Sequence, residues 1–234
     1  MAADQSNTQR FAGVDRQHAP SWGPKITFWL CHGVLLGSAI YWLVKGISLF
    51  DFTVDLPRAW LLTACIALYW LRHGVTLFSL LKRKIEWSES LGLLCFMMFF
   101  EWGLLLVGGG WSQYPLFSWP DCLAIVLVLL GSVVNTGSEW QRMVWKKDPA
   151  NKGKLYTRGL FKYAMHINYF GDVLLFSGWA LLTTQPWTLL LPLCMALSFI
   201  YFHIPGLDQY LATRYGQAFQ DYTKRTKKLI PGIY

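Results

Sequence analysis

The chain has 234 residues, of which 54% are hydrophobic, 17% are aromatic and only 15% are charged, with a net charge of +8. Soluble domains carry about 25% charged residues, so this composition excludes an ordinary soluble protein. Apolar runs of about 20 residues recur, each able to cross a hydrocarbon core roughly 30 Å thick. The charges lie at the ends of these runs, which favours membrane topology over nucleic-acid binding as their cause.

The sequence predicts a flexible polar tail over residues 1–25 and one membrane-embedded domain over residues 26–234. Apolar and aromatic residues recur every three or four positions in the final segment, 206–234, which predicts an amphipathic helix on the membrane or against the bundle. The expected fold class is therefore all-α, a polytopic bundle of about six transmembrane helices plus an amphipathic C-terminal helix. The six predicted spans are about 26–44, 59–81, 90–108, 121–135, 168–183 and 186–202.

Lysine and arginine are distributed unequally between the two sides that six spans define. Eighteen lie on the side of the termini, two (Lys45 and Arg58) lie on the other, and Arg72 lies within a span. Because cytoplasmic segments carry an excess of Lys and Arg, both termini are predicted to be cytoplasmic. The membrane is either a bacterial inner membrane or that of the endoplasmic reticulum. The five cysteines lie in apolar segments without a CxxC motif, so no metal site is expected.

Ionisable residues inside the predicted spans indicate a pocket. Arg72 and Glu101 both lie roughly 14–15 Å from the cytoplasmic ends of their spans, where pairing would lower the cost of burying both charges. Tyr69, Arg72 and His73 share one helix face. Such a face can donate a proton or a hydrogen bond to a substrate, so Tyr69, His73 and Glu101 are the candidate catalytic residues. A purely structural ion pair and a packed tyrosine remain alternatives.

The stretch 135–172 connects two apolar runs and carries the candidate cofactor site. Asn135, Ser138, Glu139 and Arg142 recur at helical spacing, and Lys146 continues the same face. A face with cations and an amide suits phosphates and a ribose or adenine edge. Across the basic connection, further polar and aromatic residues open the fifth predicted span; they are Tyr163, His166, Asn168, Tyr169 and Asp172.

At this point the chain resembles a known family. The segment GLFKYAMHINYFGD at 159–172 resembles the C-terminal signature of the steroid 5-alpha-reductase superfamily, especially its short bacterial-type members. Sterol C14 and C24 reductases carry a similar segment, and isoprenylcysteine carboxyl methyltransferases are more distantly related. The Asn-x-x-Ser-Glu pattern at 135–139 and the ending RYGQAFQDYTKRTKKLIPGIY at 214–234 extend the resemblance, so the cofactor-binding half is expected at about 135–234.

The resemblance implies a cytosolic NADPH site and hydride transfer to an activated C=C bond of a steroid-like or other apolar lipid. Asn135, Glu139, Asn168 and Asp172 match cofactor ligands of the family, and Tyr163 matches a tyrosine beside the cofactor. The phosphate-binding role falls to Arg142 or Lys146. Nearer the C-terminus, Tyr215 matches a cofactor-side tyrosine with Arg214 or His203 as its basic partner, and His166 completes the cofactor-binding set. The expected partners are membrane lipids and the lipid substrate, without nucleic acid.

Two alternatives stay open. An S-adenosylmethionine-dependent membrane methyltransferase of the isoprenylcysteine or phospholipid type has a related bundle with an Arg-His-Pro-x-Tyr-x-Gly segment, of which this chain keeps His166, Tyr169 and Gly171. Those families also carry a Glu-Glu pair where this chain has Gly206-Leu207-Asp208, which favours the reductase. A lipid-binding or scaffolding bundle without activity is the other alternative. The sequence leaves the substrate open, because residues 26–60 lack the Gln-Glu pair that grips the ketone in steroid 5-alpha-reductases.

Overall fold

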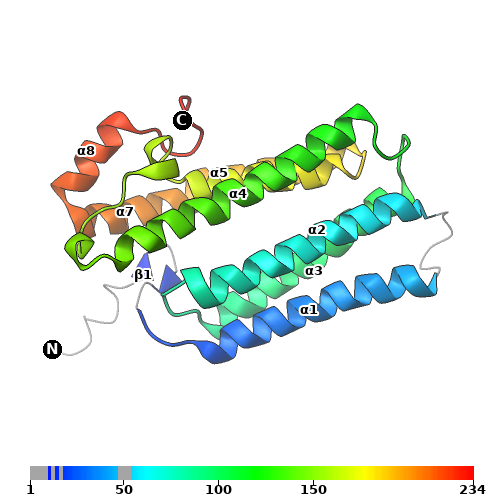
Figure 1. Ribbon diagram of the computed structural model, residues 1–234, viewed down its shortest axis with the longest axis horizontal. Coiled ribbons are helices and arrows are strands. Elements are labelled where there is room, and N and C mark those ends of the chain that lie inside the picture. The colour runs from blue at the N-terminus through cyan, green and yellow to red at the C-terminus, as the bar shows by residue number, and fades with distance from the viewer. Residues whose placement is uncertain (1–9, 12–13, 16–17, 47–53) are drawn as a thin grey trace.

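A computed structural model describes residues 10–11, 14–15, 18–46 and 54–234 of the chain. Figure 1 shows long, roughly parallel helices, with α7, α8 and β1 gathered at one end of the bundle. The bundle consists of α1 (Trp22–Lys45), α2 (Leu56–Val75) with a π-helical continuation (Thr76–Leu80), α3 (Trp87–Gly110), α4 (Trp119–Lys147), α5 (Ile167–Leu181), α6 (Leu190–Ser198), α7 (Ile204–Tyr215) and α8 (Gln217–Arg225). The two strands, β1 (Arg10–Phe11) and β2 (Val14–Asp15), form a two-residue antiparallel pair.

The predicted all-α membrane bundle is confirmed. Among the described residues, five helices are long and apolar enough to cross a membrane, namely 22–45, 56–80, 87–110, 119–147 and 186–215. The fifth predicted span is α5, which has 15 residues and is shorter than these five. The last span is one continuous rod: a 3-10 turn (Pro186–Leu189) leads into α6, and a π-helical turn (Phe199–His203) joins α6 to α7.

Two helix boundaries differ from the predicted ones. Helix α1 begins at Trp22, inside the predicted flexible tail, most of whose remaining residues lie outside the described part of the chain. Helix α4 begins with a capping box between Ser118 and Asp121 and continues to Lys147, well beyond the apolar run that ended at Asn135. Because α4 is one unbroken helix, the polar face that begins at Asn135 is a direct extension of a membrane span.

Helices α4 and α5 touch backbone to backbone through glycines. A Cβ atom added at Gly131 would lie 2.4 Å from the backbone N of Leu175, and one at Gly171 would lie 2.5 Å from the backbone N of Asn135. A Cβ atom at Gly178 would likewise lie 2.4 Å from the carbonyl O of Ala124. No real side chain fits at these distances, so small residues are what allow two membrane helices to approach this closely.

The predicted C-terminal helix over 206–234 is divided in the structure. Its first part is α7, the end of the last membrane span, and the chain turns at Gly216, which has a φ of 50°. After α8, the backbone N–H groups of Met165 and His166 donate to the carbonyls of Lys227 and Lys228, both at 2.8 Å. The Tyr222 hydroxyl donates to the Phe161 carbonyl. The C-terminal segment is therefore fastened onto the signature segment 159–172.

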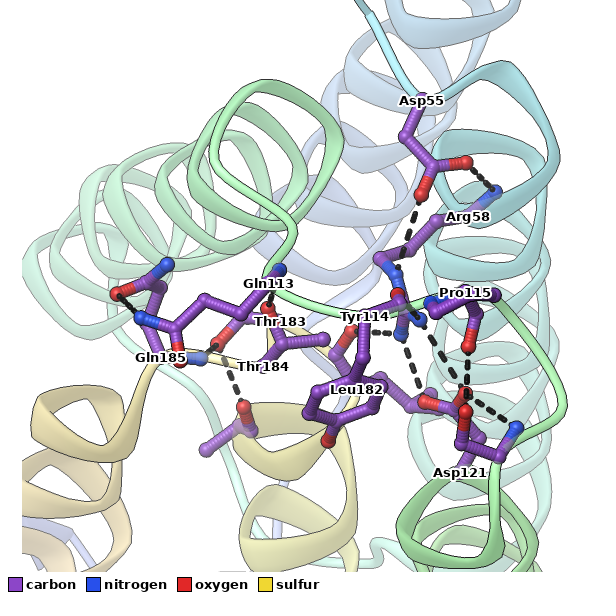
Figure 2. A network of polar contacts seen from close by, with 12 residues as sticks. Asp55, Arg58, Gln113, Tyr114, Pro115, Asp121, Leu182, Thr183, Thr184 and Gln185 are labelled. Carbon is purple, nitrogen blue, oxygen red and sulfur yellow. Dashed lines mark hydrogen bonds and ion pairs between the residues drawn. The ribbon is translucent and has the colours of Figure 1, made fainter.

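At the opposite end of the bundle, the buried ion pair between Arg58 and Asp121 holds together the α1–α2, α3–α4 and α5–α6 connections (Figure 2). The Arg58 guanidinium, which is fully buried, donates to both carboxylate oxygens of Asp121, at 2.7 and 3.2 Å. It also donates to the carbonyls of Leu182, at 2.8 Å, and Tyr114, at 3.0 Å. These contacts hold the start of α2, the α3–α4 loop, the start of α4 and the end of α5 in one arrangement.

We predict that Arg58→Met lowers the free energy of unfolding by about 3–5 kcal/mol, because it leaves the Asp121 carboxylate buried without its cation. The double variant Arg58→Met/Asp121→Asn removes that lone charge and keeps an acceptor for the α4 cap, so it should be more stable than the single variant. Thermal unfolding in detergent measures both. Equal melting of the single variant and the unmodified chain would contradict this role.

Candidate functional site

Two cavities of opposite character are lined by several of the predicted site residues. The larger, called here the apolar cavity, has a volume of about 1050 Å³ and lies between α3 and the rod formed by α6 and its π-helical turn. Its wall is mostly aromatic and aliphatic, with Phe96, Phe100, Phe176, Trp187, Leu191 and Met195 among the lining side chains. Tyr69 and His73 from α2 and Asp172 from α5 also line it. Thr188, Ser198 and His203 of the last span add further polar groups. This cavity suits a largely apolar molecule.

The second cavity, called here the basic cavity, has a volume of about 550 Å³ and lies at the end of the bundle where α4 and α7 meet the α2–α3 connection. Glu139 is the only carboxylate among its lining residues that the structure describes. The His18 side chain also lines it, and desolvation together with the charges of Arg214 and Lys146 lowers the pKa of this histidine. The cavity thus attracts anions. Its eight cationic residues are Lys82, Arg83, Arg142, Lys146, Lys147, Lys152, Lys154 and Arg214.

Arg72 lies between the two cavities and joins three helices. Its Nη2 donates to Asp172 Oδ1 at 3.2 Å and its Nε donates to Thr136 Oγ1 at 3.1 Å. The guanidinium carbon also lies 5.3 Å from the centre of the Tyr69 ring. The expected pair between Arg72 and Glu101 is therefore wrong: α5, packed against α4, supplies the carboxylate of Asp172 for Arg72.

Glu101 is paired with a histidine of α1 instead of with Arg72. Its Oε1 lies 2.6 Å from Nε2 of His32 on α1, and both side chains are almost fully buried. Nδ1 of His32 in turn lies 3.1 Å from Nδ1 of His73. Of the three candidate catalytic residues, Tyr69 and His73 line the apolar cavity, whereas Glu101 connects to it only through two histidines.

The polar face of α4 meets the start of α5 as a result of the glycine contact. Asn135 Nδ2 donates to the backbone carbonyl of Asn168 at 2.9 Å. One turn further along α4, Glu139 forms an ion pair with Arg142 and lines the basic cavity. Since Asp172, one turn beyond Asn168, lines the apolar cavity, the Asn135–Asn168 contact marks the boundary between the two cavities.

The remaining predicted cofactor residues divide into three groups. Arg142, Lys146, Arg214 and Tyr215 line the basic cavity together. His166 is buried at the start of α5, where its Nε2 lies 2.8 Å from Asp208 Oδ1 and its ring stacks on Tyr169. Tyr163 is about half exposed under the Lys162 ammonium and is not among the residues that line either cavity.

Several residues of the site were missed by sequence reasoning. Thr136 and Asp208 have no spacing that would reveal their partners, because those partners lie on other helices. Tyr210 lines the basic cavity and accepts a hydrogen bond from Arg214, one helical turn away, a spacing that could have revealed it. The lysines at 152 and 154 were visible only as part of the basic connection.

Two buried polar atoms near the boundary lack a hydrogen-bond partner among the described residues. They are Nη1 of Arg72, a donor, and Oε1 of Glu139, an acceptor. An unsatisfied buried polar atom costs about 1–3 kcal/mol, and such atoms in a native site indicate a ligand or water that completes them. Together with the basic cavity they suit an anionic ligand that also carries donor and acceptor groups.

The comparisons with known proteins agree with the fold and the signature. A family model described as a protein of unknown function (DUF1295) matches residues 96–226. Among curated relatives, 3-oxo-5-alpha-steroid 4-dehydrogenase 2 of Macaca fascicularis is 33% identical over 129 residues, 53% of this chain and 48% of the relative. The Homo sapiens protein of that name is 31% identical over 128 residues, 53% of this chain and 46% of the relative.

A protein named probable O-methyltransferase ustE, from Ustilaginoidea virens, is 32% identical over 102 residues, 42% of this chain and 35% of the relative. The alignments therefore span about half or less of the curated relatives. The family match, in contrast, covers more than half of this chain and includes α4, α5 and both cavities' boundary residues Asn135 and Asn168. By this match and by its similarity to the two 5-alpha-steroid dehydrogenases, the chain belongs to the DUF1295 family within the steroid 5-alpha-reductase superfamily.

Proposed function

We propose that the chain is an NADPH-dependent membrane reductase that transfers hydride to an activated C=C bond of a steroid-like or other apolar lipid. The observation that carries this proposal is the pair of cavities: a basic one for a phosphorylated cofactor and an apolar one for a lipid, with Arg72 and Asp172 between them. The names of the 5-alpha-steroid dehydrogenase relatives support the same chemistry.

The described residues fit NADPH. Arg142, Lys146 and Arg214 would hold its phosphates, since cationic side chains form the strongest hydrogen bonds to phosphate oxygens. The partnerless atoms Arg72 Nη1 and Glu139 Oε1 supply a donor and an acceptor for the part of the cofactor that enters the boundary. Bound there, NADPH supplies the hydride.

The apolar cavity supports a largely apolar lipid as the acceptor. Its volume, about 1050 Å³, is at the upper end of ordinary ligand pockets, which run to roughly 1,000 Å³. The Tyr69 hydroxyl and the His73 ring are polar groups of α2 in this wall, and a hydrogen bond from either polarises a conjugated carbonyl. Polarisation makes the C=C bond a better hydride acceptor.

We predict that Lys146→Met weakens NADPH binding by about 10- to 100-fold, the equivalent of one hydrogen bond to a charged group. The affinity of the variant should also depend less on salt concentration, because one fewer charge is screened. Titration in detergent at two ionic strengths measures both. Lys224→Met is the matched control, because Lys224 is exposed on α8, outside the basic cavity, and forms an ion pair with Asp221. Equal effects of the two variants would contradict the phosphate-binding role.

A second prediction tests the boundary. Asn168→Ala should weaken NADPH binding by about tenfold or more, because it removes the side-chain amide that the family resemblance matches to a cofactor ligand. The variant keeps the backbone carbonyl of residue 168 that accepts the hydrogen bond from Asn135. Thermal unfolding of the same preparation reports whether the variant is folded. NADPH affinity that is unchanged in a folded Asn168→Ala variant would refute the assignment of this boundary to the cofactor.

A methyltransferase is the second candidate, favoured by the similarity to the probable O-methyltransferase. The two functions require different nucleotides in the basic cavity. Mass spectrometry of small molecules that copurify with the chain separates them: NADPH or NADP⁺ supports the reductase, whereas S-adenosylhomocysteine supports the methyltransferase. If neither NADPH nor S-adenosylhomocysteine changes the thermal stability of the purified chain, a lipid-binding bundle without activity is favoured instead.

A further inference from the structure

We propose that Glu101, His32 and His73 form a proton relay that delivers one proton to the apolar cavity. The three side chains come from α3, α1 and α2, and they form an unbroken chain of contacts. Glu101 Oε1 lies 2.6 Å from His32 Nε2, and His32 Nδ1 lies 3.1 Å from His73 Nδ1. Only His73 lines the cavity, so the chain has a closed end at Glu101 and an open end at His73.

The geometry couples the tautomers of the two histidines. A neutral imidazole has one N–H donor and one bare nitrogen acceptor. Because the two Nδ1 atoms face each other, one must donate and the other must accept, and the choice fixes the role of Nε2 on each ring. The state of Glu101 therefore decides whether His73 presents an N–H or a bare nitrogen to the cavity.

Two protonation states of the relay satisfy both of its contacts, Glu101–His32 and His32–His73. In the loaded state the Glu101 carboxylic acid donates to His32 Nε2, His32 Nδ1–H donates to His73 Nδ1, and His73 Nε2 carries the proton that faces outward. In the discharged state the Glu101 carboxylate accepts from His32 Nε2–H, His32 Nδ1 accepts from His73 Nδ1–H, and His73 Nε2 is bare. The two states differ by one proton, which enters or leaves at His73 Nε2.

The residues around the relay exclude water from Glu101 and His32. His32 is fully buried and Glu101 is 1% exposed, and Phe28 and Tyr69 cover the histidine rings at centroid distances of 4.3–6.1 Å. A lone charge in such a place is costly, and the loaded state is neutral throughout. Arg72, the residue before His73, and Asp172, which lines the same cavity as His73, form an ion pair with each other. Oε2 of Glu101 has no hydrogen-bond partner among the described residues, which leaves Oε1 as the connected oxygen.

The relay supplies what the proposed reduction requires, and in this respect it rests on the proposed function. Reduction of one C=C bond adds a hydride to one carbon and a proton to the other. After the hydride has been added, the acceptor is an anion that still needs the proton. The His73 Nε2–H bond breaks and the new C–H bond of the acceptor forms, the proton of His32 moves to His73, and the proton of Glu101 moves to His32. The negative charge thus passes from the acceptor to Glu101. Solvent protons that reach the emptied cavity reload the chain through His73.

His73 is then the group that touches the acceptor, and His32 and Glu101 act through it. Glu101→Gln tests this division, because the glutamine amide can still donate to His32 Nε2 but cannot release its proton. We expect kcat with an enone lipid to fall about 100-fold, while KM and NADPH affinity stay within about twofold. Asp221→Asn on α8 is the matched control for a carboxylate-to-amide exchange and should leave kcat, KM and NADPH affinity unchanged. Unchanged kcat in Glu101→Gln would overturn the relay.

Infrared spectroscopy of the free protein tests the relay without any turnover. The loaded state predicts a carboxylic acid carbonyl band that Glu101→Gln abolishes. His32→Phe, which keeps the ring volume but breaks the chain, should shift this band and lower kcat as Glu101→Gln does. Absence of the band from the unmodified protein would overturn the relay even if NADPH binds. Conversely, a band that responds as expected in a protein that binds no NADPH would support the relay and refute the reductase.

Discussion

The close contact between α4 and α5 is the constraint on which the site depends. Gly131, Gly171 and Gly178 remove the side chains that would separate the two backbones, and a single added Cβ atom would meet a neighbouring backbone atom at 2.4–2.5 Å. The contact sets the rotation of both helices, so Asn135 meets Asn168 and Asp172 is directed toward Arg72. The boundary between the basic and apolar cavities follows from this rotation.

Buried charges hold the rest of the bundle against this pair of helices. Arg58 of α2 binds Asp121 of α4, and Arg72 of α2 binds Asp172 of α5. The two ion pairs lie at opposite halves of α2, so they fix its orientation along its length. Because a lone charge in a membrane is far more costly than a paired one, α2 has little freedom to turn, and Tyr69 and His73 stay directed toward the apolar cavity.

The sequence was sufficient for features that depend on local spacing. Apolar run lengths predicted the five helices that are long enough to cross a membrane, although the predicted span at 168–183 became the shorter α5. The recurrence of Asn135, Glu139, Arg142 and Lys146 predicted a common helix face, which α4 has. Pairings across the bundle were not predictable, because depth in the membrane does not say which helices are neighbours. Arg72 and Glu101 have similar depths, yet each found a different partner, Asp172 and His32. His32 showed no signal in the sequence, since a lone histidine in an apolar run is most often a packed one.

On the proposed function, the arrangement of polar groups around the apolar cavity would limit where an acceptor could react. Asp172 and Arg72 lie on the side of the basic cavity, from which the hydride would come on the proposed reaction. His73 lies on the side of His32 and Glu101, from which the proposed relay would deliver its proton. Tyr69 contacts both groups, with its ring 4.3 Å from that of His73 and 5.3 Å from the Arg72 guanidinium carbon. On the proposed reaction the acceptor bond would therefore lie beside Tyr69, between the hydride source and the proton source.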